Sequence, residues 1–249
     1  MRHPSSTEAH PLALITGGAK RIGAAIAKRL HEDGYDILLH YGKSENEAKA
    51  LAAELNEQRP QSCHVYSCAL DAQSVNGLAQ WALSFSQPLH VLVNNASQFY
   101  PTPWGKATQE DWQQLMGTNV QVPFFLTQAL LPELAKHQGC VINIIDIHSE
   151  RSLEEHPIYS ASKAALKSLT QSLAKDLGNK VRCNGVSPGA ILWPDQELSA
   201  VSKQTILDRV PQQRLGSVEN IAQTVSFICA NDYLNGQVIN VDGGRTVYS

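Results

Sequence analysis

Two residues four positions apart, Tyr159 and Lys163, could transfer a proton in this sequence. They stand at the start of a segment with helical periodicity, and residues four apart share one face of a helix. A phenol with a reference pKa of about 10 is a poor proton source or sink at neutral pH unless a nearby cation favours its ionised form, which an ammonium does. A packed tyrosine beside a surface lysine produces the same spacing, so the surrounding elements must decide between the two interpretations.

The elements that must position this pair follow a βαβα pattern. Short apolar runs typical of strands cover residues 12–16, 35–41, 64–69, 89–93, 141–147, 181–186 and 237–241. Amphipathic segments fill the gaps, and the two longest cover residues 109–137 and 157–177. Seven strands joined by helical crossovers predict a doubly wound α/β fold, with a parallel sheet and helices on both faces. Ligands are then expected beyond the carboxyl ends of the strands.

Length and composition favour one globular domain. The chain has 249 residues, 43% of them hydrophobic and 17% charged, and contains no linker or repeat that would divide it. We predict a flexible tail over residues 1–10 and a single domain over residues 11–249. Within that domain, residues 188–214 are expected to be irregular and to fold over a bound ligand.

The composition also argues against several classes of function. A net charge of -3 without a basic stripe is not typical of a nucleic-acid-binding protein. The N-terminus lacks an apolar signal core and no apolar run is long enough to cross a bilayer, so a cytoplasmic protein is expected. Five cysteines without a CxxC pair and nine histidines without an HExxH pattern predict reduced thiols and no metal site.

A glycine-rich bend, TGGAKRIG over residues 16–23, follows the first strand and leads directly into a helix. Glycines let the backbone approach a pyrophosphate, and the helix N-terminus adds amide donors. A purely structural turn is the alternative, but the position in a βαβ unit favours dinucleotide binding. At the end of the second strand, residues 40–44 read HYGKS, where an NAD site would place a carboxylate. Lys43 and Ser44 can instead pair with a 2′-phosphate, which favours NADPH, unless Lys43 is only a solvated surface lysine.

Three further motifs are Asn-Asn-Ala at residues 94–96, Thr-Asn-Val at 118–120 and Pro-Gly at 188–189. With the glycine bend and the Tyr-Lys pair, they resemble the short-chain dehydrogenase/reductase family over nearly the whole chain. The resemblance implies a Rossmann-type sheet in which Tyr159 is the proton donor in a reduction. It also implies that Lys163 lowers the pKa of Tyr159 and binds the nicotinamide ribose, and that Asn119 holds a water in the proton relay.

Asp146 departs from the pattern of that family, which places a serine thirteen residues before the tyrosine. A serine hydroxyl donates a hydrogen bond to a substrate carbonyl, whereas an ionised carboxylate only accepts hydrogen bonds. Asp146 would repel a carbonyl oxygen and suit a substrate rich in N–H donors, which argues against a plain ketone. Two alternatives stay open: Asp146 is protonated, or Ser149 takes the role of the serine.

Other departures point the same way. Arg21 replaces a glycine of the bend, Ser97 follows Asn-Asn-Ala, and residues 97–103 read SQFYPTP. With Asp146 and HYGKS, these residues resemble the pteridine reductases. The resemblance implies that a pterin ring lies between Phe99 and the nicotinamide, because flat heteroaromatic rings stack on a phenyl face; as an alternative, Phe99 is a core aromatic residue. The implied substrate-binding residues are Arg21, Ser97, Phe99, Asp146, Tyr159 and, at the mouth of the site, Trp193.

The same resemblance implies a set of contacts with NADPH. The expected cofactor-binding residues are Gly17, Arg21, Ile22, Gly23, His40, Tyr41, Lys43, Ser44, Leu70, Asn95, Ala96, Ser97, Tyr159, Lys163, Pro188, Gly189 and Ile191. One position departs from the pattern, because Ala69 stands where pteridine reductases have an aspartate that holds the adenine amino group. Asp71 could take over that role.

The resemblance therefore implies NADPH-dependent reduction of pterins, from dihydropterin to tetrahydropterin, and also of oxidised biopterin and dihydrofolate. Hydride transfer would be accompanied by protonation through Tyr159. A homotetramer packed through the two long helices is implied as well. A carbonyl or 3-oxoacyl-thioester reductase of the same fold is the first alternative, and a non-catalytic NADPH-sensing protein is the second.

Overall fold

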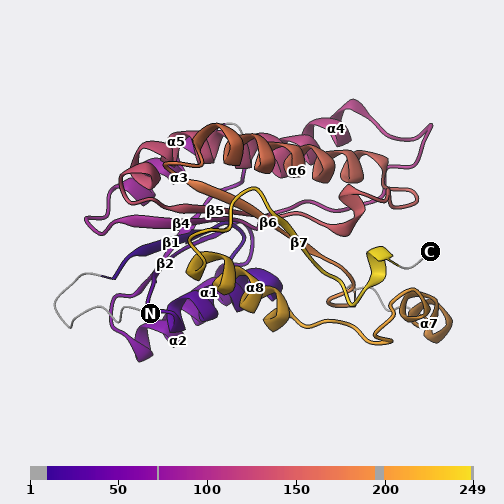
Figure 1. Cartoon of the computed structure of the whole chain (residues 1–249), viewed down its shortest axis with the longest axis horizontal. Helices are drawn as coiled ribbons and strands as arrows, with labels where there is room; N and C mark the ends of the chain where they lie inside the picture. Colours follow the sequence, from indigo (N-terminus) through magenta and orange to yellow (C-terminus); the bar gives the residue numbers. More distant parts are fainter. Residues whose placement is uncertain (1–9, 72, 194–198, 248–249) are drawn as a thin grey trace.

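A seven-stranded parallel sheet forms the centre of the molecule (Figure 1). The computed structural model describes residues 10–71, 73–193 and 199–247. The strands are β1 (Leu12–Ile15), β2 (Asp36–Tyr41), β3 (Cys63–Ser67), β4 (Leu89–Asn94), β5 (Cys140–Ile144), β6 (Arg182–Pro188) and β7 (Val238–Val241). They lie in the order β3-β2-β1-β4-β5-β6-β7, and neighbouring strands are parallel throughout. The predicted fold class is confirmed.

Helices cover both faces of this sheet (Figure 1). One face carries α3 (Val75–Leu83), α4 (Gln109–Met116), α5 (Val122–Lys136) and α6 (Pro157–Leu177), and the other carries α1 (Arg21–Glu32), α2 (Glu45–Gln58) and α8 (Val218–Ala230). Side chains alternate along a strand, so β1 contributes to both layers. Leu12 and Leu14 pack with α3 and α5, whereas Ala13 and Ile15 pack with α1 and α8.

The segment predicted as one long helix over residues 109–137 is interrupted. A π-helical turn, Gly117–Gln121, joins α4 to α5, and within it the Val122 N–H donates to the carbonyl of Gly117, five residues earlier. A π turn adds a residue without ending the helix, so the periodicity of the sequence concealed it. The turn carries Asn119 into the interior, where this residue is 1% exposed.

The expectation that residues 188–214 are irregular is wrong in part. The helix α7 (Ala200–Asp208) begins at Ser199, whose hydroxyl accepts the N–H of Ser202. Such a capping bond satisfies an amide that the first helical turn cannot pair internally. The composition of the segment did not indicate this helix start. Figure 1 shows α7 projecting beyond the sheet, beside the C-terminal turn η3 (Arg245–Val247). Residues 194–198 lie outside the described part of the chain.

The predicted N-terminal tail, residues 1–10, also lies outside the described ranges apart from His10. The ring Nδ1 of His10 donates to the carbonyl of Gly34 at 2.8 Å. Within residues 10–71, 73–193 and 199–247, no helix is long and apolar enough to cross a bilayer. In the same ranges, no three His, Cys, Asp or Glu side chains are arranged to hold a metal ion. All five cysteines are free thiols.

Candidate active site

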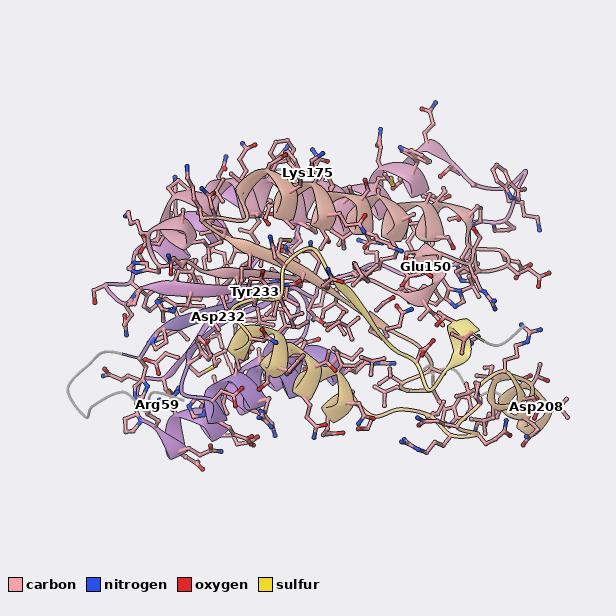
Figure 2. The ribbon with its side chains drawn as sticks, in the orientation of Figure 1. Arg59, Glu150, Lys175, Asp208, Asp232 and Tyr233 are labelled. Carbon is pink, nitrogen blue, oxygen red and sulfur yellow. The ribbon has the colours of Figure 1, made fainter. Side chains whose placement is uncertain are left out.

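Tyr159 and Asp146 meet at the carboxyl end of β5. Asp146 is the N-cap residue of the short turn η2 (Ile147–Ser149), and Glu150, which is labelled in Figure 2, is its C-cap residue. Tyr159 lies in the first turn of α6. The Tyr159 hydroxyl donates to Asp146 Oδ2 at 2.7 Å, and the His148 N–H donates to Oδ1 at 2.8 Å. Both carboxylate oxygens are engaged, which fixes the carboxylate against the phenol.

Lys163 lies one helical turn after Tyr159 and is 2% exposed. Its ammonium donates to the carbonyl of Ile144 at 2.9 Å and lies 5.7 Å from the centroid of the Tyr159 ring. Burial lowers the pKa of Lys163 to about 8, and the charge of Asp146 opposes this shift. The two residues therefore share one helical face, as the spacing predicted, and Lys163 holds its proton less tightly than a surface lysine does.

The pKa of Tyr159 shifts in the direction opposite to the one expected from the sequence. Burial, the charge of Asp146 and the hydrogen bond to Asp146 raise this pKa well above its ordinary value. The expectation that Lys163 lowers it is corrected, because the carboxylate contacts the phenol directly while the ammonium donates to Ile144. Tyr159 therefore keeps its proton at neutral pH, as a proton donor must.

Asn119, in the π turn, joins three segments of the site. Its Oδ1 accepts the Ser97 hydroxyl at 3.0 Å and the Gln98 N–H at 2.9 Å. Its Nδ2 donates to the Gln98 carbonyl and to the Ser162 hydroxyl, each at 3.0 Å. A carboxamide offers two donor and two acceptor positions, so this side chain is saturated. It fixes the loop after β4 against α6, and the water that the resemblance implied stays a prediction.

Phe99 lies in that loop, and 56% of the residue is exposed. Its ring stacks on the ring of His156 at a centroid distance of 4.7 Å and an angle of 10°. The Tyr159 ring meets it edge-on, at 4.7 Å and 81°. A bond of 2.7 Å from the Thr102 N–H to the carbonyl of Glu155 holds the two loops together. Phe99 is therefore an exposed aromatic residue beside the phenol and not a core residue.

The glycine bend is closed against the end of β4. Gly17 has a φ of +62°, and a Cβ there would lie 3.0 Å from the Cα of Ala96. Gly23 is more restricted, because a Cβ would lie 2.3 Å from the carbonyl oxygen of Gly17. Asn95 Nδ2 donates to the carbonyls of Thr16 and Gly17, each at 2.9 Å. The predicted residues of the bend and of Asn-Asn-Ala thus form one rigid backbone cradle.

Arg21 is the first residue of α1 and has a φ of 51°, in the left-handed region that favours glycine. A glycine at this position, as in most of the family that the sequence resembles, would carry no strain. Arg21 is exposed, whereas the following Ile22 is half-buried and packs on the core. An arginine that keeps a costly backbone conformation at the start of a helix is well placed to meet an anion there.

The five residues HYGKS divide into a buried and an exposed part. His40 and Tyr41 are 2% and 7% exposed, whereas Lys43 is exposed and Ser44 is the N-cap residue of α2. The Ser44 hydroxyl makes no capping bond. The backbone cradle, an exposed cation and a hydroxyl that is not used for capping together fit the phosphate groups of a nicotinamide dinucleotide.

The expected adenine end lies beside Lys43. Leu70 and Ala69 line a hollow there, and Asp71 lies in its rim. The Asp71 carboxylate accepts the N–H groups of Gln73 at 2.9 Å and Ser74 at 2.8 Å. It therefore holds the turn before α3, and its role toward the adenine stays a prediction.

The segment after β6 packs against the end of β7. The Gly189 N–H donates to the carbonyl of Val241 at 3.0 Å, and Ile191 is 5% exposed. A Cβ on Gly189 would lie 2.6 Å from Cβ of Asp242, so only glycine fits after Pro188. Trp193 is half-buried, with the ammonium of Lys203 in α7 at 5.8 Å from its ring centroid.

Two residues near the site were missed by the sequence analysis. His156 stacks on Phe99, and Arg245 lies within the electrostatic reach of Asp146. Burial and the charge of Arg209 lower the pKa of Arg245, and the carboxylates of Asp146 and Asp242 oppose that shift. No local motif marks either residue, because each reaches the site through tertiary packing of segments distant in sequence.

Comparisons with known proteins agree with this geometry. The profile of a family described as Enoyl-(Acyl carrier protein) reductase matches residues 17–246. Pteridine reductase 1 of Leishmania tarentolae is 33% identical, covering 95% of this chain and 96% of its own length. The short-chain dehydrogenase/reductase FrzI of a Cladobotryum species is 30% identical, with coverages of 93% and 94%. The 3-oxoacyl-[acyl-carrier-protein] reductase FabG of Staphylococcus aureus is also 30% identical, with coverages of 93% and 96%. The chain belongs to the short-chain dehydrogenase/reductase family and is an oxidoreductase.

Proposed function

We propose that this protein reduces pterins with NADPH. The observation that carries the proposal is the bond of 2.7 Å from the Tyr159 hydroxyl to Asp146. A carbonyl oxygen offers only lone pairs, which a carboxylate repels, whereas a pterin presents N–H groups that a carboxylate can accept. The name of the pteridine reductase relative supports the same substrate class.

The residues have separate tasks in this proposal. Bound NADPH would supply the hydride. Tyr159 would pass its hydroxyl proton to the ring nitrogen next to the carbon that accepts the hydride. Asp146 would orient the phenol and the N–H edge of the substrate, and the buried ammonium of Lys163 would offset the negative charge left on the phenol. For the second reduction of a fully oxidised pterin, the proton would come from water.

Phe99 supports a flat substrate. Its ring is more than half exposed, and its edge-on contact with Tyr159 places it next to the proton donor. A heteroaromatic ring bound on this side chain would be held parallel to it by stacking. An acyl chain would gain less from such a surface, since it has no π system to stack.

The charges around Lys43 support NADPH over NADH. The two acidic residues at the start of α2 are occupied: Glu45 pairs with Lys49 at 2.6 Å and Glu47 pairs with Lys20 at 2.6 Å. Lys43 can therefore meet a 2′-phosphate without an unpaired carboxylate beside it. A carboxylate at this place, as in NAD sites, would repel the phosphate.

We also propose that the protein forms a homotetramer through α5 and α6. Phe124 and Phe125 are 45% and 43% exposed on α5. A largely apolar cavity of about 210 Å³ opens between the two helices, lined by side chains such as Leu131 and Leu173. Sedimentation of the wild type and of Phe124→Glu tests this proposal: a tetramer that the variant dissociates supports it, and a wild-type monomer contradicts it.

The function is tested with a substrate panel. NADPH oxidation is followed with dihydrobiopterin, dihydrofolate, a 3-oxoacyl thioester and simple ketones, and each assay is repeated with NADH. The proposal predicts turnover of the pterins with NADPH. Turnover confined to the thioester or the ketones would assign the protein to the alternative class of carbonyl reductases. NADPH binding without turnover of any of them would favour the sensing role.

A further inference from the structure

We propose that His40 is a positioning residue that shapes the glycine bend for the cofactor pyrophosphate, and that it does so only as the neutral tautomer with its hydrogen on Nε2. This inference rests on the dinucleotide site of the proposed function and not on the identity of the substrate. His40 is the last residue but one of β2 and is 2% exposed, so its ring cannot lie on the surface with Lys43.

The ring of His40 bridges two segments that would surround the cofactor. Its Nδ1 lies 3.1 Å from the amide nitrogen of Gly17, in the bend after β1. Its Nε2 lies 3.0 Å from the carbonyl oxygen of Cys68, just after β3. The bend and the loop after β3 are thus linked through one imidazole.

These two contacts determine the tautomer. The backbone N–H of Gly17 can only donate, so Nδ1 of His40 must be the acceptor with its lone pair free. The carbonyl of Cys68 can only accept, so Nε2 must carry the hydrogen. A second proton, on Nδ1, would place two N–H groups against each other and break the bond to Gly17.

Residue 40 also holds the next amide of the bend, because its own carbonyl accepts the N–H of Gly18 at 2.9 Å. Two successive amides of the bend therefore point at residue 40 and away from any phosphate. We expect the cofactor phosphate to meet the N-terminal turn of α1 instead. Loss of the ring contact would release Gly17, which at a φ of +62° depends on its surroundings to keep this shape.

The surroundings of His40 favour the neutral ring. Burial lowers its pKa from the ordinary value, and the Cys68 carbonyl opposes the shift; no charged side chain in the described part of the chain is among the causes. The titratable side chains on the surrounding elements include His64, Tyr66 and Cys68 in and after β3, Lys20 and Arg21 at the start of α1, and Tyr41 and Lys43 in its own segment. His40 therefore gains its second proton only below the usual range, as pH falls through its lowered pKa.

The test measures binding of NADP⁺, which unlike NADPH is stable in acid, by calorimetry on the full chain between pH 8 and pH 5. The variants are His40→Gln, whose amide can accept at one atom and donate at the other, and His40→Leu, which can do neither. His64→Gln is the matched control, because His64 lies on the neighbouring strand and donates to an exposed carbonyl. At pH 8 we expect a Kd within about threefold of the wild type for the glutamine variant and about tenfold higher for the leucine variant.

The pH profile separates positioning from a merely structural role. The 2′-phosphate protonates at a pKa of about 6 and weakens binding in every variant. The wild type and His64→Gln should lose about threefold more affinity than His40→Gln between pH 7 and pH 5, because only they carry the ring that protonates. Parallel profiles for wild type and His40→Gln would overturn the proposal, as would an unchanged Kd for a folded His40→Leu.

Two outcomes of this test need separate treatment. If circular dichroism shows that His40→Leu does not fold, the comparison of wild type with His40→Gln decides alone. If the wild type binds NAD⁺ more tightly than NADP⁺, the cofactor preference in the proposed function fails. The same variants titrated with NAD⁺, which has no 2′-phosphate, then still support or overturn the role of His40.

Discussion

Around β1 and β2 the site is made of main chain: the bend at Gly17 is held by backbone contacts and by amide and imidazole groups that bond to the backbone. Around β5 and α6 it is made of side chains, with Tyr159, Asp146 and Lys163 within one small group. In the proposed function, the first region would bind the dinucleotide through main-chain groups that many sequences can supply. The second would determine the substrate class, because its chemistry depends on single side chains. Substitutions in the two regions should therefore affect different kinetic constants.

The largest effect is expected from Tyr159→Phe, which removes the proton donor from the side-chain region. Turnover of oxidised biopterin, whose reduction would take its proton from Tyr159, should fall about a thousandfold, within the range typical of lost acid–base catalysis. The Kd of NADP⁺ should stay within about twofold. Tyr100→Phe is the matched control, since its hydroxyl donates only to groups in and near α4. A variant with unchanged turnover would remove Tyr159 from the mechanism.

The next effect is expected from Asp146→Ser, which restores the residue of the general family pattern. The kcat/KM for dihydrobiopterin should fall about a hundredfold, because the substrate N–H groups lose a charged acceptor. Turnover of simple ketones should rise at the same time. Glu150→Ser removes an exposed carboxylate from the same turn and should change neither constant. Equal losses for both substrate classes would mean that Asp146 does not set specificity.

A smaller effect is expected in the main-chain region, from Lys43→Ala. The KM for NADPH should rise about tenfold and the KM for NADH should not change, because only the 2′-phosphate loses a charge-assisted hydrogen bond. Lys28→Ala, which removes a surface lysine paired with Glu54, serves as the control. A fall in kcat with an unchanged KM for NADPH would contradict the proposal that the main-chain region controls cofactor binding and the side-chain region controls turnover.

The smallest effect is a pH dependence that comes from Lys163. Its ammonium loses the proton as pH rises through about 8, so pterin turnover at pH 8 should be about half of its value at pH 7. In Lys163→Arg this alkaline decline should move to higher pH, because a guanidinium stays charged. Turnover measured from pH 6.5 to pH 9.5 checks both statements. A wild-type rate that stays flat up to pH 9.5 would contradict them.

Local spacing was enough to predict much of this arrangement. Short apolar runs located the strands of the sheet, and the four-residue spacing of Tyr159 and Lys163 placed both on one face of α6. The bend at Gly17 followed from glycines between a strand and a helix. These features depend on residues that are neighbours in sequence, so their physical cause is visible in the sequence itself.

Features that arise from tertiary packing could not be read in this way. The pKa of Tyr159 is raised first by burial and then by Asp146, which comes from another element. The saturation of Asn119 depends on the loop after β4 and on α6 meeting at one point. The tautomer of His40 depends on groups from β1 and β3. Each requires distances between segments, which composition and periodicity do not contain.

The π turn between α4 and α5 has a geometrical consequence of its own. Each residue advances an α-helix by about 100°, so the additional residue between Gly117 and Gln121 shifts the rotational phase of everything after it. Because of this shift, the continuous helix from α4 to α5 places Asn119 in the interior and, a few residues later, Phe124 on the surface. Deleting a single residue of the π turn would keep the helix continuous but rotate α5 relative to α4. Asn119 and Phe124 could then no longer both keep their present positions. The turn thus sets the rotational phase between the residues that face the interior and those that face the exposed surface.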